Sequence, residues 1–296
     1  MIKINSTVKF CGGYLKHVRH WSNCNECYMQ FYIFLPEDMP QQQRGEKFGT
    51  LYYLSGLKSD EERAPTKLGF APIAKKHNLA IVFNDVSPRG IDDTCPEAIQ
   101  DDWTWGYGAG HYCDATQMPW KRHFNMYTYI TKELPELIES YFPCDPARKS
   151  ITGFSMGGNG SMVCAIKNPG KYKSCTAITP IVPTLSPLFG SKAMPAYFGN
   201  MKAARAYCAV SLLNDGGKNV KLPPGFITYA GLDQWGAENM LEDVMEEAVR
   251  KNGHDFPIKM MEGYNHSYFM GSACIEEHLI FHAAHLNGGR IVTANL

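Results

Sequence analysis

Short hydrophobic runs alternate along this chain with longer segments of helical spacing. The runs are rich in β-branched and aromatic residues and predict β-strands at residues 30–36, 49–54, 79–84, 150–153, 174–181, 225–231 and 256–261. Helical spacing predicts helices at residues 71–78, 126–141, 159–168, 237–251 and 274–286. The alternation of strands and helices predicts an α/β fold with a mostly parallel central sheet.

Composition favours one large folded unit that acts on a small molecule. Hydrophobic residues make up 44% of the 296 residues and charged residues 20%, which is enough apolar material for a single large core. Lys plus Arg and Asp plus Glu each total 29, so no net field attracts nucleic acid or an anionic membrane. We expect one domain over residues 1–286 and a polar tail over residues 287–296.

The sequence predicts neither a membrane span nor a secretion signal. Polar and charged residues interrupt the N-terminal region, and no apolar run reaches the ~18 residues that a transmembrane helix needs. The ten cysteines are dispersed through the chain, and without a secretion signal we expect reduced thiols.

No metal site and no cofactor are predicted. Cys24 and Cys27 form a lone CxxC without the second pair of a zinc site. His278, His282 and His285 share one face of the last predicted helix, but no HExxH arrangement accompanies them. We expect that face to be solvated or to lie in an interface.

Residues 151–158 (ITGFSMGG) carry the strongest candidate chemistry. A short β-branched run leads into Gly-x-Ser-x-Gly, centred on Ser155, and then into a helix-compatible segment. A serine hydroxyl becomes an effective nucleophile at such a sharp turn, where a base reaches it and helix amides face the developing oxyanion. Gly153 and Gly157 leave room for the turn. An ordinary glycine-rich turn is the alternative, so the motif needs support elsewhere in the chain.

Two polar residues follow later predicted strands in the order that a hydrolase triad requires. Asp233 follows the strand at 225–231, and His266 follows the strand at 256–261. The order Ser, Asp, His is that of the α/β-hydrolase triad. The histidine takes the proton of Ser155, and the acid orients the imidazole and stabilises its cation.

A long segment with little periodicity, residues 85–120, is typical of a loop that shapes a site. Its residues Trp103, Trp105, Tyr107 and His111 either wall an acyl or leaving-group pocket or pack the loop onto the body of the protein. The sequence leaves both alternatives open.

Several segments together resemble the S-formylglutathione hydrolase family, also called the esterase D family, over nearly the whole chain. They are residues 53–57 (YLSGL), 87–90 (SPRG), 106–116 (GYGAGHYCDAT), 127–135, 153–160 (GFSMGGNG), 167–174 (KNPGKYKS) and 263–268 (GYNHSY). The resemblance implies an α/β-hydrolase fold with helices on both faces of the sheet. It also implies a cytosolic serine hydrolase without a cofactor that cleaves S-formylglutathione to formate and glutathione, completing formaldehyde detoxification.

The same resemblance implies a role for five residues. Ser155 is the nucleophile, His266 is the base and Asp233 is the acid. The backbone amides of Leu57 and Met156 form the oxyanion hole.

The acid falls on a departure from the family pattern. Family members usually have two residues between the strand-ending glycine and the catalytic aspartate, whereas only Leu232 separates Gly231 from Asp233 here. When this chain is aligned with the family pattern without a gap, Gln234 takes the position of the aspartate, and a glutamine cannot stabilise an imidazolium as a carboxylate does. A one-residue deletion in this chain aligns Asp233 with the family's aspartate, and we therefore select Asp233.

Substrate recognition is predicted less directly. The two carboxylates of glutathione favour cationic side chains nearby, and Lys58 and Arg89 are the candidates for that role. An ordinary surface or structural charge is the alternative for each. Trp103 is the candidate for a pocket wall. A general short-acyl carboxylesterase is the alternative enzyme, because the same triad attacks esters and thioesters. A non-catalytic binding protein of the same fold is the alternative outside enzymes.

The sequence leaves the oligomeric state and the cellular compartment of the protein open. A homodimer is one alternative for the oligomeric state. Residues 294–296 (ANL) loosely resemble the Ser-Lys-Leu peroxisomal signal, whereas the other interpretation of this end is a frayed polar tail.

Overall fold

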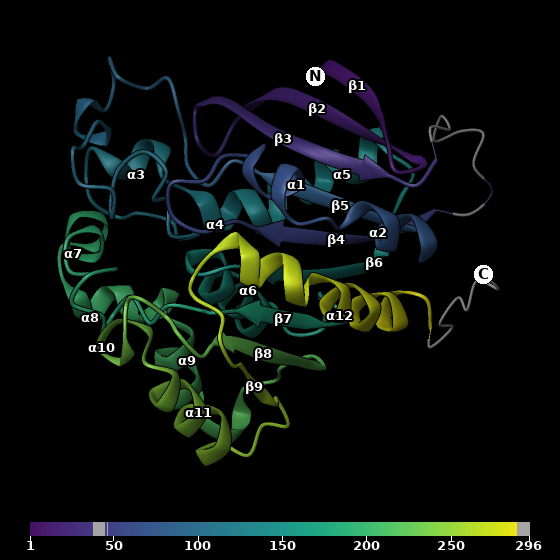
Figure 1. Cartoon of the computed structure of the whole chain (residues 1–296). Helices are drawn as coiled ribbons and strands as arrows, with labels where there is room; N and C mark the ends of the chain where they lie inside the picture. The colour runs from purple at the N-terminus through teal and green to yellow at the C-terminus, as the bar shows by residue number, and fades with distance from the viewer. Residues whose placement is uncertain (38–44, 46, 289–296) are drawn as a thin grey trace.

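A nine-stranded β-sheet forms the centre of the protein in a computed structural model that describes residues 1–37, 45 and 47–288. The strands lie in the order β1-β2-β3-β5-β4-β6-β7-β8-β9 (Figure 1). Their bounds are β1 Ile2–Phe10, β2 Gly13–Ser22, β3 Cys27–Leu35, β4 Phe48–Leu54, β5 Leu79–Asn84, β6 Cys144–Gly153, β7 Cys175–Ile178, β8 Gly225–Ala230 and β9 Ile258–Met261. Strands β4 to β9 run parallel, and β1 to β3 add an antiparallel extension through β3 and β5. The predicted mostly parallel sheet is confirmed.

Helices cover both faces of this sheet, as predicted. One face carries α1 (Arg63–Lys67), α2 (Ala71–Lys76) and α12 (Tyr268–Leu286), and α12 runs across the front of the sheet in Figure 1. The other face carries α5 (Leu134–Tyr141), α6 (Met156–Lys167), α9 (Ala209–Gly216) and α11 (Glu242–Lys251). The shorter helices lie in the connections and are α3 Trp120–His123, α4 Met126–Thr128, α7 Ala193–Phe198, α8 Met201–Ala204 and α10 Ala237–Met240.

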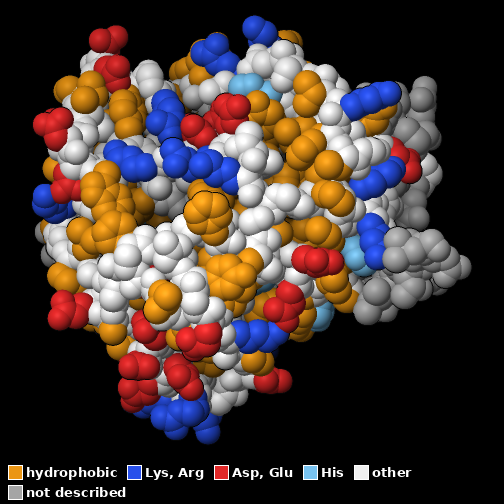
Figure 2. Space-filling view, viewed as in Figure 1, with side chains coloured by type: hydrophobic (Ala, Val, Ile, Leu, Met, Phe, Trp, Pro, Cys, Tyr) orange, Lys and Arg blue, Asp and Glu red, His pale blue; other side chains and the backbone are white. Residues whose placement is uncertain are grey.

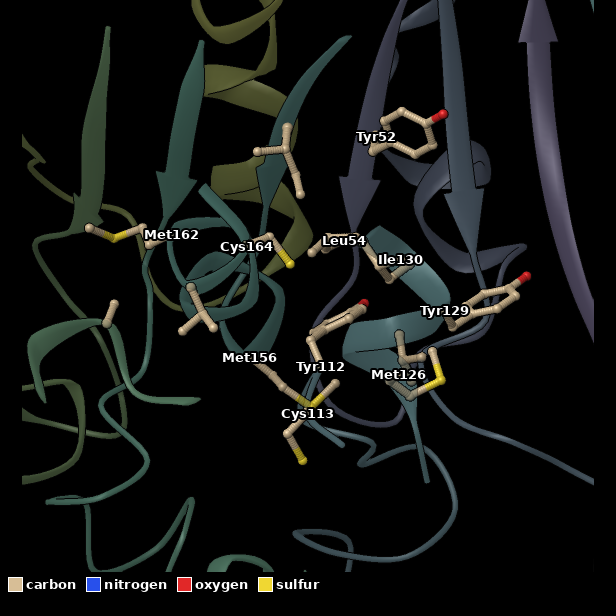
Figure 3. Close-up of a cluster of buried hydrophobic side chains, with 14 of the residues drawn as sticks. Tyr52, Leu54, Tyr112, Cys113, Met126, Tyr129, Ile130, Met156, Met162 and Cys164 are labelled. Carbon is tan, nitrogen blue, oxygen red and sulfur yellow. The ribbon is translucent and has the colours of Figure 1, made fainter. Parts of the chain in front are cut away.

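The alternation of side chains along β4 divides the interior into two hydrophobic cores. Tyr52 and Leu54 belong to the core on the α6 side, where Figure 3 shows Leu54 together with Met156 at the start of α6. Leu51 and Tyr53 belong to the core under α12. Because successive side chains of a strand point to opposite faces, β4 is buried on both sides. The strand ends that carry the polar residues therefore rest on a rigid support.

Two strands at the N-terminus were not among the sequence predictions. Strands β1 and β2 form a hairpin around Cys11 and Gly12, which both adopt positive φ angles, of 46° and 77°. Most of the β1 side chains are exposed, so the strand lacks the apolar run used to identify the others. The turn glycines between two segments of alternating polarity were the available signal.

The predicted single helix at residues 237–251 is two helices. Leu241 adopts the left-handed conformation, with φ 55° and ψ 41°, and separates α10 from α11. The side chain of Asn239 ties the short α10 to its surroundings, because its amide donates to Trp235 O at 2.9 Å and its oxygen accepts from Leu188 N at 3.2 Å. The break depends on contacts that local spacing does not encode.

The prediction of a solvated or interface face on the last helix was wrong for His278 and His282. Both side chains are fully buried. Nδ1 of His278 and Nε2 of His282 lie 2.7 and 2.8 Å from the hydroxyl of Thr176 in β7, and Nδ1 of His282 lies 2.8 Å from the hydroxyl of Ser174. The histidines thus anchor α12 to the sheet through a buried polar network.

Several further observations concern cysteines, metals and the chain ends. All ten cysteines are free thiols, without a disulfide.

Within the described residues, no group of three or more His, Cys, Asp or Glu side chains is placed to hold a metal ion. No helix of this part of the chain has the length and apolarity that crossing a membrane requires. The division into a domain at 1–286 and a tail at 287–296 stays a prediction, and residues 294–296 lie outside the described part of the chain.

Candidate active site

Ser155 occupies a strained turn between the end of β6 and the start of α6. Its φ of 58° and ψ of −116° are unusual for a residue with a side chain. The backbone is held from both neighbouring strands, because Ser155 N donates to Ile178 O at 2.8 Å and Phe154 N donates to Leu54 O at 2.9 Å. These bonds hold the serine at the carboxyl edge of the sheet in the geometry of a nucleophile elbow.

The two glycines of the motif are required by close backbone contacts. A Cβ atom on Gly157 would lie 1.9 Å from the carbonyl oxygen of Leu54, and one on Gly153 would lie 2.2 Å from the carbonyl oxygen of Gly157. Neither obstacle is a side chain that could move aside. The structure therefore supports the elbow and rejects an incidental glycine-rich turn.

Asp233 and His266 meet at the ends of β8 and β9. Oδ2 of Asp233 accepts a hydrogen bond from Nδ1 of His266 at 2.7 Å, and both side chains are less than a tenth exposed (9% and 7%). Oδ1 of Asp233 accepts from the backbone amide of Trp235 at 3.0 Å. With its Nδ1 proton directed at the carboxylate, the imidazole keeps Nε2 as the atom that can accept a proton.

Gln234 makes different contacts. Its side-chain nitrogen donates to the carbonyl oxygen of His266 at 3.1 Å, and its side-chain oxygen accepts from the amide of His266 at 2.9 Å. The carboxylate of Asp233 thus contacts the imidazole, while the amide of Gln234 holds the backbone of the same residue. This arrangement supports the choice of Asp233 over Gln234.

A small cavity of about 170 Å³ brings four of the sequence-predicted residues together. Ser155 and His266 both line it, and so do Leu57 and Trp103. The cavity also includes aromatic and cationic residues that the sequence predictions did not include, namely Arg63, Phe154, Phe189, Trp235 and Tyr268. Local sequence offered only weak signals for them, such as the position of Trp235 two residues after the candidate acid.

The loop that carries Leu57 lies directly against the elbow. A Cβ atom on Gly56 would lie 3.1 Å from the Cβ of Ser155. The hydroxyl of Tyr112 donates to the carbonyl oxygen of Ser55 at 2.9 Å and holds this loop in place. Met156 is the first residue of α6, where a helix amide has no partner within the helix. Both predicted oxyanion amides thus belong to segments that flank the serine.

Three aromatic rings form one wall of the cavity. The ring centres of Trp103 and Trp235 are 5.3 Å apart, and Phe189 lies 5.6 Å from Trp235 and 6.1 Å from Trp103. These rings come from the long loop, the loop after β8 and the segment before α7. They leave an apolar surface beside Ser155 and limit the space for an acyl group.

The other candidates in the long loop pack it against the protein. Trp105 lies 5.7 Å from the ring of Trp120, and the hydroxyl of Tyr107 donates to Asp92. His111 is buried, and this burial lowers its pKa to about 4. Within this loop, Trp103 therefore forms part of the pocket wall, whereas the other three residues pack the loop onto the body of the protein.

The structure does not bring Lys58 or Arg89 into the cavity. Nζ of Lys58 donates to the carbonyl oxygen of Tyr107 at 2.6 Å, and partial burial lowers the pKa of this lysine. Arg89 donates to both oxygens of the buried Asp85 at 2.6 and 3.0 Å, and also to Ser59 O at 3.0 Å. Both cations stabilise loops around the site, which argues against their predicted role in substrate binding.

Phe154 and Tyr268 enclose the cavity on the side of the imidazole. The ring of Phe154 lies 4.8 Å from that of His266 and stacks on that of Tyr268 at 5.7 Å. The hydroxyls of Tyr268 and Ser59 are 3.3 Å apart. This packing limits the movement of the imidazole and keeps water from one of its faces.

Known proteins resemble this chain in sequence and in structure. A family model described as "Putative esterase" matches residues 22–273. The S-formylglutathione hydrolase of Mus musculus is 36% identical and that of Bos taurus 38% identical, each over 294 residues that cover 97% of this chain and 99% of the relative. A solved S-formylglutathione hydrolase from Agrobacterium tumefaciens superposes with a TM-score of 0.86 at 35% identity, covering 96% of this chain and 99% of that chain.

A more distant likeness concerns the fold alone. The serine hydrolase FphF from Staphylococcus aureus superposes with a TM-score of 0.70 at 16% identity and covers 92% of this chain and 98% of that chain. The sheet, the elbow and the sequence matches over almost the full length lead to one conclusion: the chain belongs to the S-formylglutathione hydrolase family of esterases.

Proposed function

We propose that this protein hydrolyses S-formylglutathione to formate and glutathione with Ser155, His266 and Asp233 as its catalytic triad. The observation that carries the proposal is the 2.7 Å contact between Asp233 and His266 beside the cavity that also holds Ser155. Membership in the S-formylglutathione hydrolase family supports the choice of substrate.

In the first step, Oγ of Ser155 attacks the formyl carbon while Nε2 of His266 takes the hydroxyl proton. Asp233 holds the imidazole and stabilises its cation. The amides of Leu57 and Met156 donate to the carbonyl oxygen as it becomes an oxyanion. The C–S bond then breaks, the departing glutathione thiolate takes the proton from Nε2 of His266, and a formyl ester remains on the serine.

In the second step, a water molecule takes the place of the thiol. Nε2 of His266 removes a proton from this water, whose oxygen attacks the formyl ester. The second tetrahedral intermediate collapses, formate leaves, and the proton on His266 returns to Oγ of Ser155. The thiolate is a good leaving group, so protonation matters less for its departure than for that of an alkoxide.

The small cavity favours a small acyl group. Its volume of about 170 Å³ is bounded on one side by Trp103, Phe189 and Trp235, which leaves little room beside the serine for a long acyl chain. A formyl or acetyl group fits this space, so a general short-acyl carboxylesterase is the second candidate function. The experiment below separates the two.

The decisive measurement is the ratio of kcat/KM for S-formylglutathione to kcat/KM for 4-nitrophenyl acetate. We expect the thioester to be preferred by at least about a hundredfold, because only the thioester offers a glutathione moiety to bind. A ratio near one would favour the general carboxylesterase. A purified, folded protein that turned over neither substrate would leave only the non-catalytic binding protein.

Two further properties belong to this proposal. We place the reaction in the cytosol, and the location of a fluorescent fusion of the whole chain tests this. A punctate peroxisomal pattern that depends on residues 294–296 would contradict it.

The homodimer also stays a prediction, and light scattering on the purified protein tests it.

A further inference from the structure

The short helix α1 places two cations beside the candidate active site. Arg63 lines the cavity that contains Ser155. Lys67 lines a neighbouring groove of about 480 Å³, and the groove and the cavity share Ser267 and Tyr268. Residues four apart lie on one face of a helix, about 6 Å apart along its axis. The two cations therefore line two adjacent depressions, of which the first contains the serine.

Both cations are available to a ligand. Within the described part of the chain, neither Arg63 nor Lys67 forms an ion pair, in contrast to Arg89. Nζ of Lys67 lies 5.8 Å from the centre of the Tyr268 ring, so the lysine extends over the floor of the groove. Figure 2 shows Lys and Arg side chains beside exposed hydrophobic side chains between α1 and α3, with Asp and Glu side chains next to them.

The acidic residues just before α1 do not line either depression. Oδ1 of Asp60 accepts the backbone amides of Glu62 and Arg63 at 3.1 and 2.9 Å. Oε1 of Glu61 lies 3.0 Å from Nε2 of His17 on β2. Neither these carboxylates nor Glu62 are among the lining residues. Among the described residues, the linings of the cavity and the groove therefore each contain a cation and no carboxylate.

The rim of the groove also offers an apolar contact. Phe269 is 82% exposed, although it follows directly on the largely buried Tyr268. An exposed phenylalanine beside a cation suits a ligand that combines methylene groups with carboxylates. Glutathione has this composition, with one carboxylate at each end of a tripeptide whose central cysteine carries the sulfur.

The dimensions of the ligand match the spacing of the cations. The sulfur must lie near Ser155 for the thioester to be cleaved, and each carboxylate is about two residues from the cysteine, a reach of roughly 7 Å. One carboxylate can thus reach Arg63 at the cavity while the other follows the groove to Lys67. The planar guanidinium of Arg63 can donate to both oxygens of a carboxylate.

We infer that Arg63 and Lys67 form the subsite that binds the two carboxylates of the glutathione leaving group. This inference rests on the proposed function, because it assigns a position to the glutathione moiety of that substrate. The two cations bind the carboxylates in the ground state and in the transition state alike. Their loss therefore raises KM and changes kcat little.

The experiment compares Arg63→Gln, Lys67→Gln and the double variant with the wild type on two thioesters. S-formylglutathione carries both carboxylates, whereas S-formyl-N-acetylcysteamine is a neutral thioester with the same formyl group. We expect each single substitution to raise KM for S-formylglutathione about tenfold and the double variant to raise it about a hundredfold. The ratio of kcat/KM values for the charged and neutral thioesters should fall by the same factors.

A matched control uses Arg250→Gln, which removes an exposed arginine on α11. This variant should leave the ratio unchanged. Increasing ionic strength should raise KM for S-formylglutathione in the wild type and have a smaller effect in the double variant, because salt screens exposed charges.

The two proposals fail in different ways. A wild-type enzyme with equal kcat/KM values for the neutral thioester and for S-formylglutathione would overturn the proposed substrate, and the subsite with it. A wild type that prefers S-formylglutathione, together with a double variant of unchanged KM, would overturn the subsite alone. A double variant that loses activity equally on both thioesters would also overturn it, because a carboxylate subsite acts on the charged substrate alone.

Discussion

Gln234 and His266 are joined by two reciprocal hydrogen bonds between the side-chain amide of the first and the backbone of the second. The glutamine nitrogen donates to the histidine carbonyl oxygen at 3.1 Å, and the histidine amide donates to the glutamine oxygen at 2.9 Å. Asp233, the preceding residue, contacts the imidazole at 2.7 Å. Two consecutive residues of one loop thus hold the backbone and the side chain of the candidate base.

Gln234→Ala should lower kcat about tenfold while the fold persists. The substitution removes both bonds to the backbone of His266, each worth about 1 kcal/mol, and leaves the contact with Asp233 intact. Gln234→Glu keeps the acceptor and loses the donor, so its kcat should lie between those of the wild type and the alanine variant. Steady-state kinetics measures the series, and an alanine variant with wild-type kcat would show that Asp233 alone positions the imidazole.

Asp233→Asn should leave the protein folded and lower kcat by roughly three to four orders of magnitude. An asparagine presents the wrong hydrogen-bonding pattern to Nδ1 and cannot stabilise the imidazolium. The rate should be measured across the pH range in which histidines titrate, with circular dichroism as the check on folding. Undiminished kcat/KM over that range would rule out any triad that includes Asp233.

Ser155→Ala should abolish turnover, because the serine hydroxyl forms the covalent intermediate. A fluorophosphonate probe should label the wild type on Ser155, and mass spectrometry of the labelled peptide locates the adduct. An active alanine variant, or an adduct on another residue, would remove the nucleophile assignment.

Ser155→Gly should also be inactive but more stable than Ser155→Ala. A glycine adopts a φ of 58° without the steric cost that a Cβ atom incurs there, a cost of about 1 kcal/mol or more. Both variants lack the hydroxyl, so the comparison isolates backbone strain. Denaturant unfolding measures the difference, and equal stabilities would show that the elbow is not strained.

The buried histidines of α12 should make the fold sensitive to acid. Burial lowers the pKa of His278 to about 3 and holds that of His282 well below its usual value of 6.5. Below about pH 6.5 the unfolded chain therefore binds protons that the folded chain does not, and stability falls as the pH decreases toward the lowered values. Each histidine contributes a slope of about 1.4 kcal/mol per pH unit.

His278→Gln tests this account. Between about pH 6 and pH 4, the unfolding free energy of the variant should fall less steeply with decreasing pH than that of the wild type, by the contribution of one histidine. His285→Gln is the matched control, because His285 lies on the same helix and is only partly buried. Parallel pH profiles for the wild type and His278→Gln would contradict the assignment.

Much of the fold follows from local pattern. The apolar runs at β4 and β5 and the break into Gly-x-Ser-x-Gly predict buried strands and an elbow, because these signals arise within a few neighbouring residues. The order of Ser155, Asp233 and His266 along the chain likewise places the candidate triad at three strand ends. The structure places them at those ends and brings Asp233 within 2.7 Å of His266.

Other features depend on partners that are distant in sequence. Leu241 interrupts a helix whose amphipathic spacing is continuous. Lys58 donates a hydrogen bond to the carbonyl oxygen of Tyr107, and Arg89 donates one to that of Ser59. A charged residue in a loop is free or engaged according to which loop it meets, and composition does not specify that encounter.

The sequence by itself determined strands β3 to β9, the elbow and the identity of the residues able to form a triad, because turn chemistry and hydrophobic spacing act over short stretches of chain. Only the tertiary structure decided between Asp233 and Gln234, because the loop after β8 had to be placed against the loop after β9 before either side chain met His266. The cation beside the cavity is Arg63 for the same reason, since α1 reaches the serine only once the sheet has formed.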